Sequence, residues 1–261
     1  MFSEVRHLID RAKGFFAFGD ATLAEYKHDP LNAQLLWHFG FWRLRQLRSA
    51  GRSTPSDILP ADLYRGVAVL LADLCSFSSY VRDTPAPETV RDSLTSFYSK
   101  SRYQIIDSGG LLNQFVGDEV VGFFGVPDRS AGFVGNALRT ARALVSIGES
   151  VSQQWQRQID RIQPSGGLRI GLAIGDLQVV SLRPFSRTHI GAIGDCINVA
   201  ARLMTIAGPG EIVASNAFYQ TLGEEEQACF EGVEPVEARN VGWIKAWKLG
   251  RGKDVRDFYR S

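Results

Sequence analysis

The chain has 261 residues, of which 44% are hydrophobic, and its formal net charge is +1. This length suits one large domain, or one domain with an extension, and the composition is typical of a globular protein with a substantial core. The near-neutral charge gives no reason to expect a nucleic-acid polymer or a membrane as a partner. Three cysteines without a CxxC spacing favour reduced thiols in a cytoplasm over a zinc site.

Residues 1–62 are expected to form a helical region followed by a linker. The stretch AQLLWHFGFWRLRQLRS carries aromatic residues and leucines on one side and arginines on the other. The stretch SAGRSTPSDILPADLY gathers serine, glycine and proline, which is typical of a linker. The charges throughout MFSEVRHLIDRAKGFF are unlike a signal peptide, and no apolar run reaches the roughly 20 residues of a membrane span, so we expect a cytoplasmic protein.

The main domain is expected over residues 63–250, before a short tail at 251–261. GVAVLLAD is a continuous apolar run and predicts a buried strand that ends at Asp73. PETVRDSLTSFYSKSRYQIIDSGG has apolar residues at helical spacing, and its glycine pair is expected to stop the helix. LLNQFV and VVGFFG then predict a hairpin that turns at Gly117 and Asp118.

A second set of elements follows this hairpin. An amphipathic helix is expected over about residues 131–158, and GLRIGLAIGDLQVVSL predicts two strands that meet around Gly175. A short helix is expected to open near Asp195 as its N-cap, and strand and helix signals continue to about residue 249. The order strand–helix–strand–strand–helix–strand predicts an α+β fold of the ferredoxin-like βαββαβ kind.

Two carboxylates stand at the ends of predicted strands. Asp73 lies where the first strand ends and a loop begins, and Asp118 lies at the turn of the hairpin. If these strands are neighbours, both carboxylates lie at one end of the sheet, where they repel each other unless a cation lies between them. Mg²⁺ prefers one or two carboxylates together with phosphate oxygens, so the pair predicts a metal-dependent phosphoryl site. The alternative is that both residues only form turns.

Two other motifs offer groups that suit phosphate. DLCSFSSY leads into a helix, so the backbone N–H groups of Cys75, Ser76 and Phe77 could hold phosphate oxygens, although serines are also ordinary helix starters. GDCINVAARL places Asn198 and Arg202 four residues apart, on one face of a helix. Arginine offers a donor fork for phosphate and asparagine can hold a hydroxyl group, but such a pair can also be a solvated helix face.

Four stretches together resemble successive motifs of the class III nucleotidyl cyclases, in the family's order and with similar spacing, from about residue 65 to 249. They are VLLADLCSFSSY, NQFVGDEVVGFFG, RIGLAIGD and GAIGDCINVAARLMTIAGPGEIVAS. The helical N-terminus lies outside this resemblance. The resemblance implies a head-to-tail homodimer whose active sites lie at the interface and whose substrate is a nucleoside triphosphate.

The resemblance also implies roles for individual residues. Asp73 and Asp118, with the backbone of Leu74, would bind two Mg²⁺ or Mn²⁺ ions in each active site. Asn198 would position the ribose, and Arg202 would stabilise the transition state at the α-phosphate. One protomer would supply the carboxylates and the other the Asn–Arg pair. In EARNVGWIKAWKL the family's lysine for the terminal phosphates is replaced by Arg239, which keeps the charge.

The sequence departs from the family at both positions that read the base. Gln114 stands where adenylate cyclases commonly carry lysine and guanylate cyclases glutamate, and Gly191 stands where aspartate, threonine or cysteine is common. Gln114 could pair with either pyrimidine or with a purine, and Gly191 removes a polar side chain. Tyr80, seven residues after Asp73, could shorten the pocket and disfavour purines, or could simply pack beside the helix start.

This combination resembles the bacterial pyrimidine cyclases of the Pycsar anti-phage systems, which make cyclic UMP or cyclic CMP. We therefore expect a cyclase that prefers UTP, with a product that a separate effector reads during anti-phage defence. A decaying pseudoenzyme would lose catalytic groups at least as readily as base-reading groups, and here the catalytic groups remain. The alternatives are a cytidylate, adenylate or guanylate cyclase, and a cyclase-like module that binds a nucleotide without turning it over.

Overall fold

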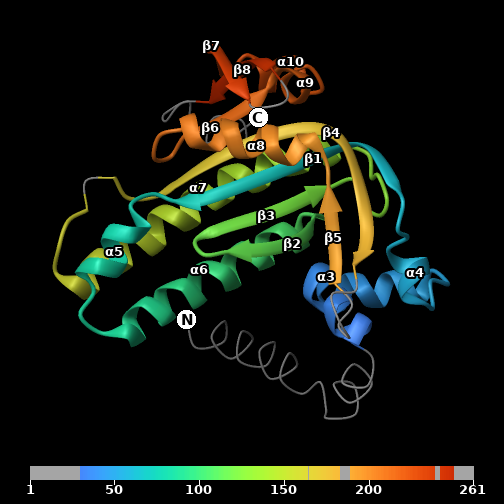
Figure 1. The fold of residues 1–261 in the computed structure, drawn as a ribbon, viewed down its shortest axis with the longest axis horizontal. Helices are drawn as coiled ribbons and strands as arrows, with labels where there is room; N and C mark the ends of the chain where they lie inside the picture. Colours follow the sequence, from blue (N-terminus) through green and yellow to red (C-terminus); the bar gives the residue numbers. More distant parts are fainter. Residues whose placement is uncertain (1–29, 164, 183–188, 239–241, 250–261) are drawn as a thin grey trace, which may run out of the picture.

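A computed structural model describes residues 30–163, 165–182, 189–238 and 242–249 (Figure 1). The helix expected before residue 30 and the tail expected at 251–261 lie outside the described residues. The strands are β1 (Leu63–Leu74), β2 (Leu111–Val116), β3 (Glu119–Phe124), β4 (Leu168–Leu182), β5 (His189–Ile193), β6 (Ile212–Ser215), β7 (Phe230–Ala238) and β8 (Gly242–Leu249). The helices are α3 (Pro30–Ser49), α4 (Pro55–Ile58), α5 (Phe77–Asp83), α6 (Pro87–Asp107), α7 (Phe133–Ile159), α8 (Asp195–Ile206), α9 (Asn216–Tyr219) and α10 (Glu224–Gln227).

The described strands form one mixed sheet in the order β2-β3-β1-β4-β6-β8-β7, and β5 pairs with β4. β4 and β6 run parallel, and β1 runs antiparallel to both of its neighbours, β3 and β4. This places β1, the continuous apolar run of the sequence, near the middle of the sheet. The α+β fold expected from the sequence is confirmed.

β1 is buried on both faces, which explains its unbroken apolar run. Its even-numbered residues, such as Leu70 and Ala72, belong to the core cluster that α6 and α7 cover. Its odd-numbered residues, such as Val69 and Leu71, belong to the cluster that α3 and α8 cover. Since side chains alternate between faces along a strand, Asp73 continues the odd-numbered face, near the point where that face leaves the core.

Two sequence expectations in the second half of the domain are wrong. GLRIGLAIGDLQVVSL forms one long strand, β4. Gly175 lies inside this strand and pairs with Val67 of the neighbouring strand β1. A side-chain carbon added at Gly175 would lie 2.9 Å from Cβ of Cys196, so this glycine allows α8 to pack closely on the sheet. The N-cap of α8 is Gly194, and Asp195 is the first residue of the helix.

The segment predicted as a linker is folded, and α3 packs on the domain. Leu35, Phe39 and Leu44 of α3 are fully buried in the same cluster as the odd-numbered residues of β1. α4 begins with a capping box between Thr54 and Asp57. The domain boundary expected at residue 62 stays a prediction.

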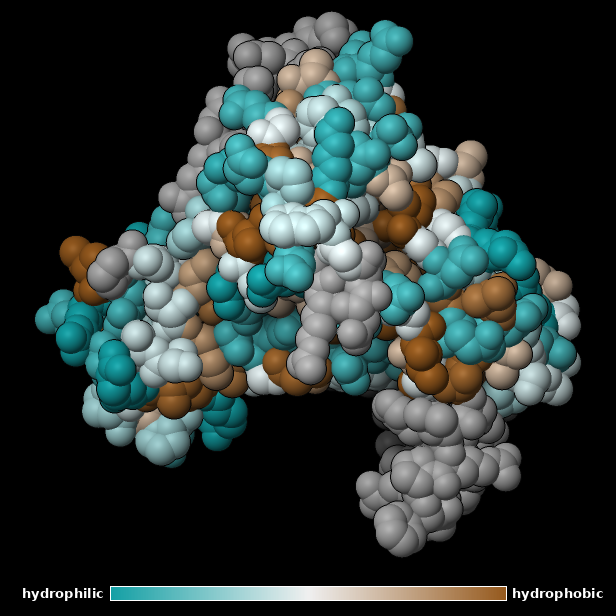
Figure 2. Space-filling model, turned by 45° about the horizontal axis from the view of Figure 1, so that its top comes forward, coloured by the Kyte–Doolittle hydropathy of each residue, from teal (hydrophilic) through white to brown (hydrophobic). Residues whose placement is uncertain are grey.

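The surface is mixed in character. Figure 2 shows hydrophobic residues on one face in separate small groups among hydrophilic ones. Large hydrophobic side chains that are exposed include Ile193 and Trp243. Within the described ranges, none of the helices combines the length and apolarity that a membrane crossing requires.

Candidate active site

The structure brings the two predicted carboxylates together. Asp73 is only 8% exposed and pairs across the sheet with Glu119 of β3. Asp118 lies in the two-residue turn between β2 and β3, after Gly117, whose φ is +61°. Burial, as the largest cause, and then the nearby Asp73 raise the pKa of Asp118 to about 7. The two carboxyl groups are therefore close enough for the ionised form of one to disfavour ionisation of the other.

Arg169 is a member of this site that the sequence reasoning missed. It is paired with Asp73 across the β1–β4 ladder, and its Nε and Nη2 atoms donate to Oδ2 of Asp73 over 2.7 and 2.5 Å. The guanidinium group thus compensates the charge of Asp73. The available signal was a lone arginine in an apolar strand, RIGLAIG, which is an unusual place for a charge.

The turn that carries Asp118 is held from α6. The Tyr98 hydroxyl group donates a hydrogen bond to the Gly117 carbonyl, and the Tyr98 ring stacks on Phe115 with 4.1 Å between ring centroids. Burial, and then the charge of Asp118, raises the pKa of Tyr98. The hydroxyl group therefore stays protonated at neutral pH and remains a donor to the turn.

The segment after Asp73 has a defined backbone conformation. Leu74 ends β1, and the Cys75 N–H donates to the Gly167 carbonyl over 2.9 Å, so this amide is not free for a phosphate. Ser76 is left-handed, with φ 62° and ψ 20°, and Phe77 opens α5. A non-glycine residue rarely takes this conformation unless its surroundings hold it there.

Tyr80 lies in a packing position. Its side chain is 1% exposed and its ring lies 4.9 Å from that of Trp155 in α7. Burial is the largest cause that raises the pKa of its hydroxyl group, which lies near Ser152 and Gln156 of the same helix. This position favours the packing alternative over a wall of a base pocket.

The Asn–Arg pair lies on the exposed face of α8. Asn198 and Arg202 are both exposed, while Cys196, Ala200 and Leu203 of the same helix are buried. Nε of Arg202 donates to the Glu237 carbonyl in β7 over 2.9 Å. Between the described residues of one chain, no hydrogen bond or ion pair joins this pair to the carboxylates.

The base-reading positions are accessible. Gln114 is exposed on β2, next to an irregularity in the β2–β3 register, and Gly191 is partly exposed on β5 opposite Val180. Nothing in their surroundings identifies a base, so their role stays a prediction. Arg239, expected at the terminal phosphates, lies outside the described residues.

Curated relatives match the greater part of this chain. The uncharacterized protein Rv1320c of Mycobacterium tuberculosis is 29% identical over 177 residues, which cover 67% of this chain but only 29% of that protein. The uncharacterized protein Mb1354c of Mycobacterium bovis gives the same figures. The chain thus corresponds to less than a third of these relatives' length.

Solved structures share the fold. The guanylyl cyclase Cya2 matches with a TM-score of 0.63 at 22% identity, and the adenylyl cyclase CyaB of P. aeruginosa with 0.64 at 21%. Each match covers 74% of this chain and 97% of the other. The family described as the adenylate and guanylate cyclase catalytic domain matches residues 59–251, which include both carboxylates and the α8 pair. The chain therefore belongs to this cyclase family.

Proposed function

We propose that the chain is a metal-dependent nucleotidyl cyclase that converts a pyrimidine nucleoside triphosphate, preferably UTP, to the 3′,5′-cyclic monophosphate and pyrophosphate. The observation that carries this proposal is the placement of Asp73 beside the turn that carries Asp118, since Asp73 pairs with Glu119, the next residue after Asp118. A fold that only needed turns would not place two acidic side chains so close together, because their repulsion costs stability.

The residues of the carboxylate pair fit a divalent cation. Two carboxylates and a raised pKa describe a site with excess negative charge, and the pKa of neighbouring Glu119 is also raised by burial and by Asp73. Mg²⁺ and Mn²⁺ favour such oxygen ligands together with phosphate oxygens. When bound, these ions would neutralise the triphosphate and favour ionisation of the ribose 3′-hydroxyl group. Asp73, Asp118 and the Leu74 carbonyl would hold them.

The reaction forms a bond between the ribose 3′-oxygen and the α-phosphorus, breaks the bond to the β-phosphate and releases a proton to solvent. Arg169 fixes the side chain of Asp73 in place before substrate arrives. Arg202 is oriented through its Nε by the Glu237 carbonyl, and its terminal amino groups can donate to an α-phosphate oxygen as charge develops there. Asn198 can hold the ribose from the same helix face.

We further propose a homodimer in which each site combines the carboxylates of one copy with Asn198 and Arg202 of the other. The resemblance to the class III cyclases supports this arrangement, and among the described residues of one chain no hydrogen bond or ion pair joins the two sets. A symmetric pair of copies would then form two such sites.

The choice of a pyrimidine base rests on Gln114 and Gly191 and on the resemblance to the Pycsar cyclases. The packing position of Tyr80 removes the steric argument against purines. Purine substrates are the second candidate, because similar solved structures carry the names guanylyl cyclase and adenylyl cyclase. A role of the product in anti-phage defence, through a separate effector, rests on the resemblance alone.

A competition assay tests the proposal. The protein is incubated with UTP, CTP, ATP and GTP at equal concentration with Mn²⁺, and cyclic products and pyrophosphate are measured against an Asp73→Ala control. We expect cyclic UMP first and cyclic CMP second, with no product from the control. Cyclic AMP or cyclic GMP as main product would refute the base assignment, and binding without pyrophosphate release would refute catalysis.

A further inference from the structure

The backbone just after Asp73 is held in its conformation by contacts from α7, some direct to α5 and others through Gly167. Ser76 is the residue under strain there, because a non-glycine residue rarely adopts a left-handed conformation unless its surroundings hold it. The segment's first anchor is a chain of two hydrogen bonds. Ser152 of α7 accepts from the Gly167 N–H over 2.8 Å, and the Gly167 carbonyl accepts from the Cys75 N–H over 2.9 Å.

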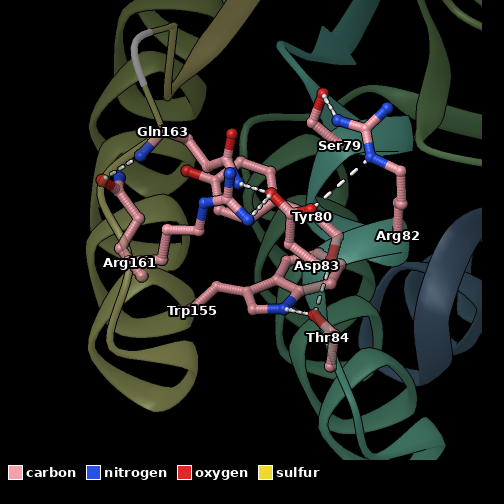
Figure 3. A network of polar contacts seen from close by, with 9 residues as sticks. Ser79, Tyr80, Arg82, Asp83, Thr84, Trp155, Arg161 and Gln163 are labelled. Atoms are coloured by element: carbon pink, nitrogen blue, oxygen red, sulfur yellow. Dashed lines mark hydrogen bonds and ion pairs between the residues drawn. The ribbon is translucent and has the colours of Figure 1, made fainter.

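Trp155 supplies the second anchor, at the far end of α5. Its ring packs on Tyr80 with 4.9 Å between centroids and lies edge-on to Phe77 at 6.1 Å. Its Nε1 donates to Oγ1 of Thr84 over 2.9 Å, and this hydroxyl group donates to the Tyr80 carbonyl over 2.6 Å. Figure 3 shows the indole beneath Tyr80, with its hydrogen bond reaching Thr84. One side chain thus contacts the beginning, the middle and the end of the α5 region.

Polar contacts to Asp83 complete the attachment. Its side chain accepts from Nε2 of Gln163 over 2.8 Å and pairs with Arg161 over 3.2 Å, both just after α7 (Figure 3). These contacts lower the pKa of Asp83, with the hydrogen bond from Gln163 as the largest cause. The helix that follows the metal-binding segment is therefore attached to α7 by stacking, hydrogen bonds and an ion pair.

We propose that Trp155 is a positioning residue for the segment 74–77. It fixes α5 and thereby maintains the left-handed Ser76 that sets the direction of the backbone after Asp73. The inference rests on the proposed function for its chemical consequence, because a displaced segment would weaken metal and triphosphate binding at Asp73. Trp155 itself touches neither the carboxylates nor the substrate.

The test compares Trp155→Phe with a matched control, Trp247→Phe. Trp247 also stacks on a tyrosine, Tyr219 at 3.8 Å, and donates its Nε1 to Oδ1 of Asn216 over 3.0 Å, but it lies in β8. Thr84→Val is a second test variant that keeps the side-chain volume and removes the hydrogen bond. We expect the Mn²⁺ concentration for half-maximal cyclisation to rise about fivefold in Trp155→Phe and Thr84→Val, and to stay unchanged in Trp247→Phe.

Hydrogen exchange of the metal-free proteins gives a readout that does not depend on activity. Exchange of each variant is measured at the same number of degrees below its own thermal unfolding midpoint. Under these matched conditions, amides of residues 74–84 should exchange several-fold faster in Trp155→Phe than in Trp247→Phe. If no nucleotide is cyclised by the wild-type protein, the proposed function fails, and this exchange result alone decides the inference. Equal exchange in the two variants, or an unchanged metal requirement in an active Trp155→Phe protein, would overturn it.

Discussion

Replacing Asp118 with asparagine should make the metal-free protein more stable and at the same time inactive. The folded protein holds the proton of Asp118 up to about pH 7, whereas the ordinary value is 3.8. Between pH 4 and pH 7 the unfolded chain releases this proton and the folded chain keeps it. The free energy of unfolding of the wild type should therefore fall as the pH rises through this range and level off above it.

The size of the effect follows from the same shift. A change in the pKa of Asp118 from 3.8 to about 7 corresponds to about 4 kcal/mol in the free energy of unfolding if the whole shift contributes. Asp118 is partly exposed, and solvent screening reduces this to about 2 kcal/mol. Asparagine has nearly the shape of a protonated aspartic acid, but it carries no charge at any pH. Asp118→Asn should thus exceed the wild type by about 2 kcal/mol at pH 8 and match it near pH 4.

Urea unfolding with a chelator, at pH values from 4 to 8, measures this difference, and a cyclisation assay on the same samples measures activity. Parallel pH profiles for the two proteins would refute the reasoning, because the pKa of Asp118 would then not be raised in the folded protein. A stable, fully active variant would refute the role of Asp118 as a metal ligand.

Three further substitutions test other parts of the site. Tyr98→Phe should raise the metal concentration for half-maximal activity about fivefold, since it removes the hydroxyl group that holds the Gly117 carbonyl; a metal titration with an unchanged midpoint would contradict this. Gln114→Ala should change the ratios of kcat/KM among the four nucleotides by about tenfold or more, and identical ratios would remove Gln114 from base reading. Tyr80→Ala should lower the free energy of unfolding by about 3–5 kcal/mol without favouring purines, and denaturation with the competition assay measures both.

The pair of carboxylates was predictable from the sequence because both residues lie close to the ends of strands that the apolar pattern identifies. The unbroken apolar run of β1 indicates a strand that is buried on both faces. The tight turn within LLNQFVGDEVVGFF makes β2 and β3 neighbouring antiparallel strands. Once β1 and β3 are neighbours, Asp73 and Asp118 must approach each other. α6 and α7 were also predictable, since long amphipathic patterns leave few other interpretations.

Arg169 and Tyr80 show what the pattern could not provide. The contact between Arg169 and Asp73 depends on the β1–β4 register, which joins segments 96 residues apart. The position of Tyr80 depends on a tryptophan in α7 that the sequence does not mark as its neighbour. Gly175 was misread for a similar reason: a glycine in an apolar run can mark a turn or a close approach, and only the packing of α8 distinguishes them.

The most direct measurement of the central claim mixes two inactive variants. Asp73→Ala lacks a metal ligand and Arg202→Ala lacks the phosphate-binding arginine, so each should be inactive with UTP and Mn²⁺. After subunit exchange, half of the dimers are mixed, and each mixed dimer has one site with both wild-type halves. We predict recovery of up to about a quarter of the wild-type activity. Mixed dimers that form but make no cyclic UMP would contradict a cyclase site shared between Asp73 of one copy and Arg202 of the other.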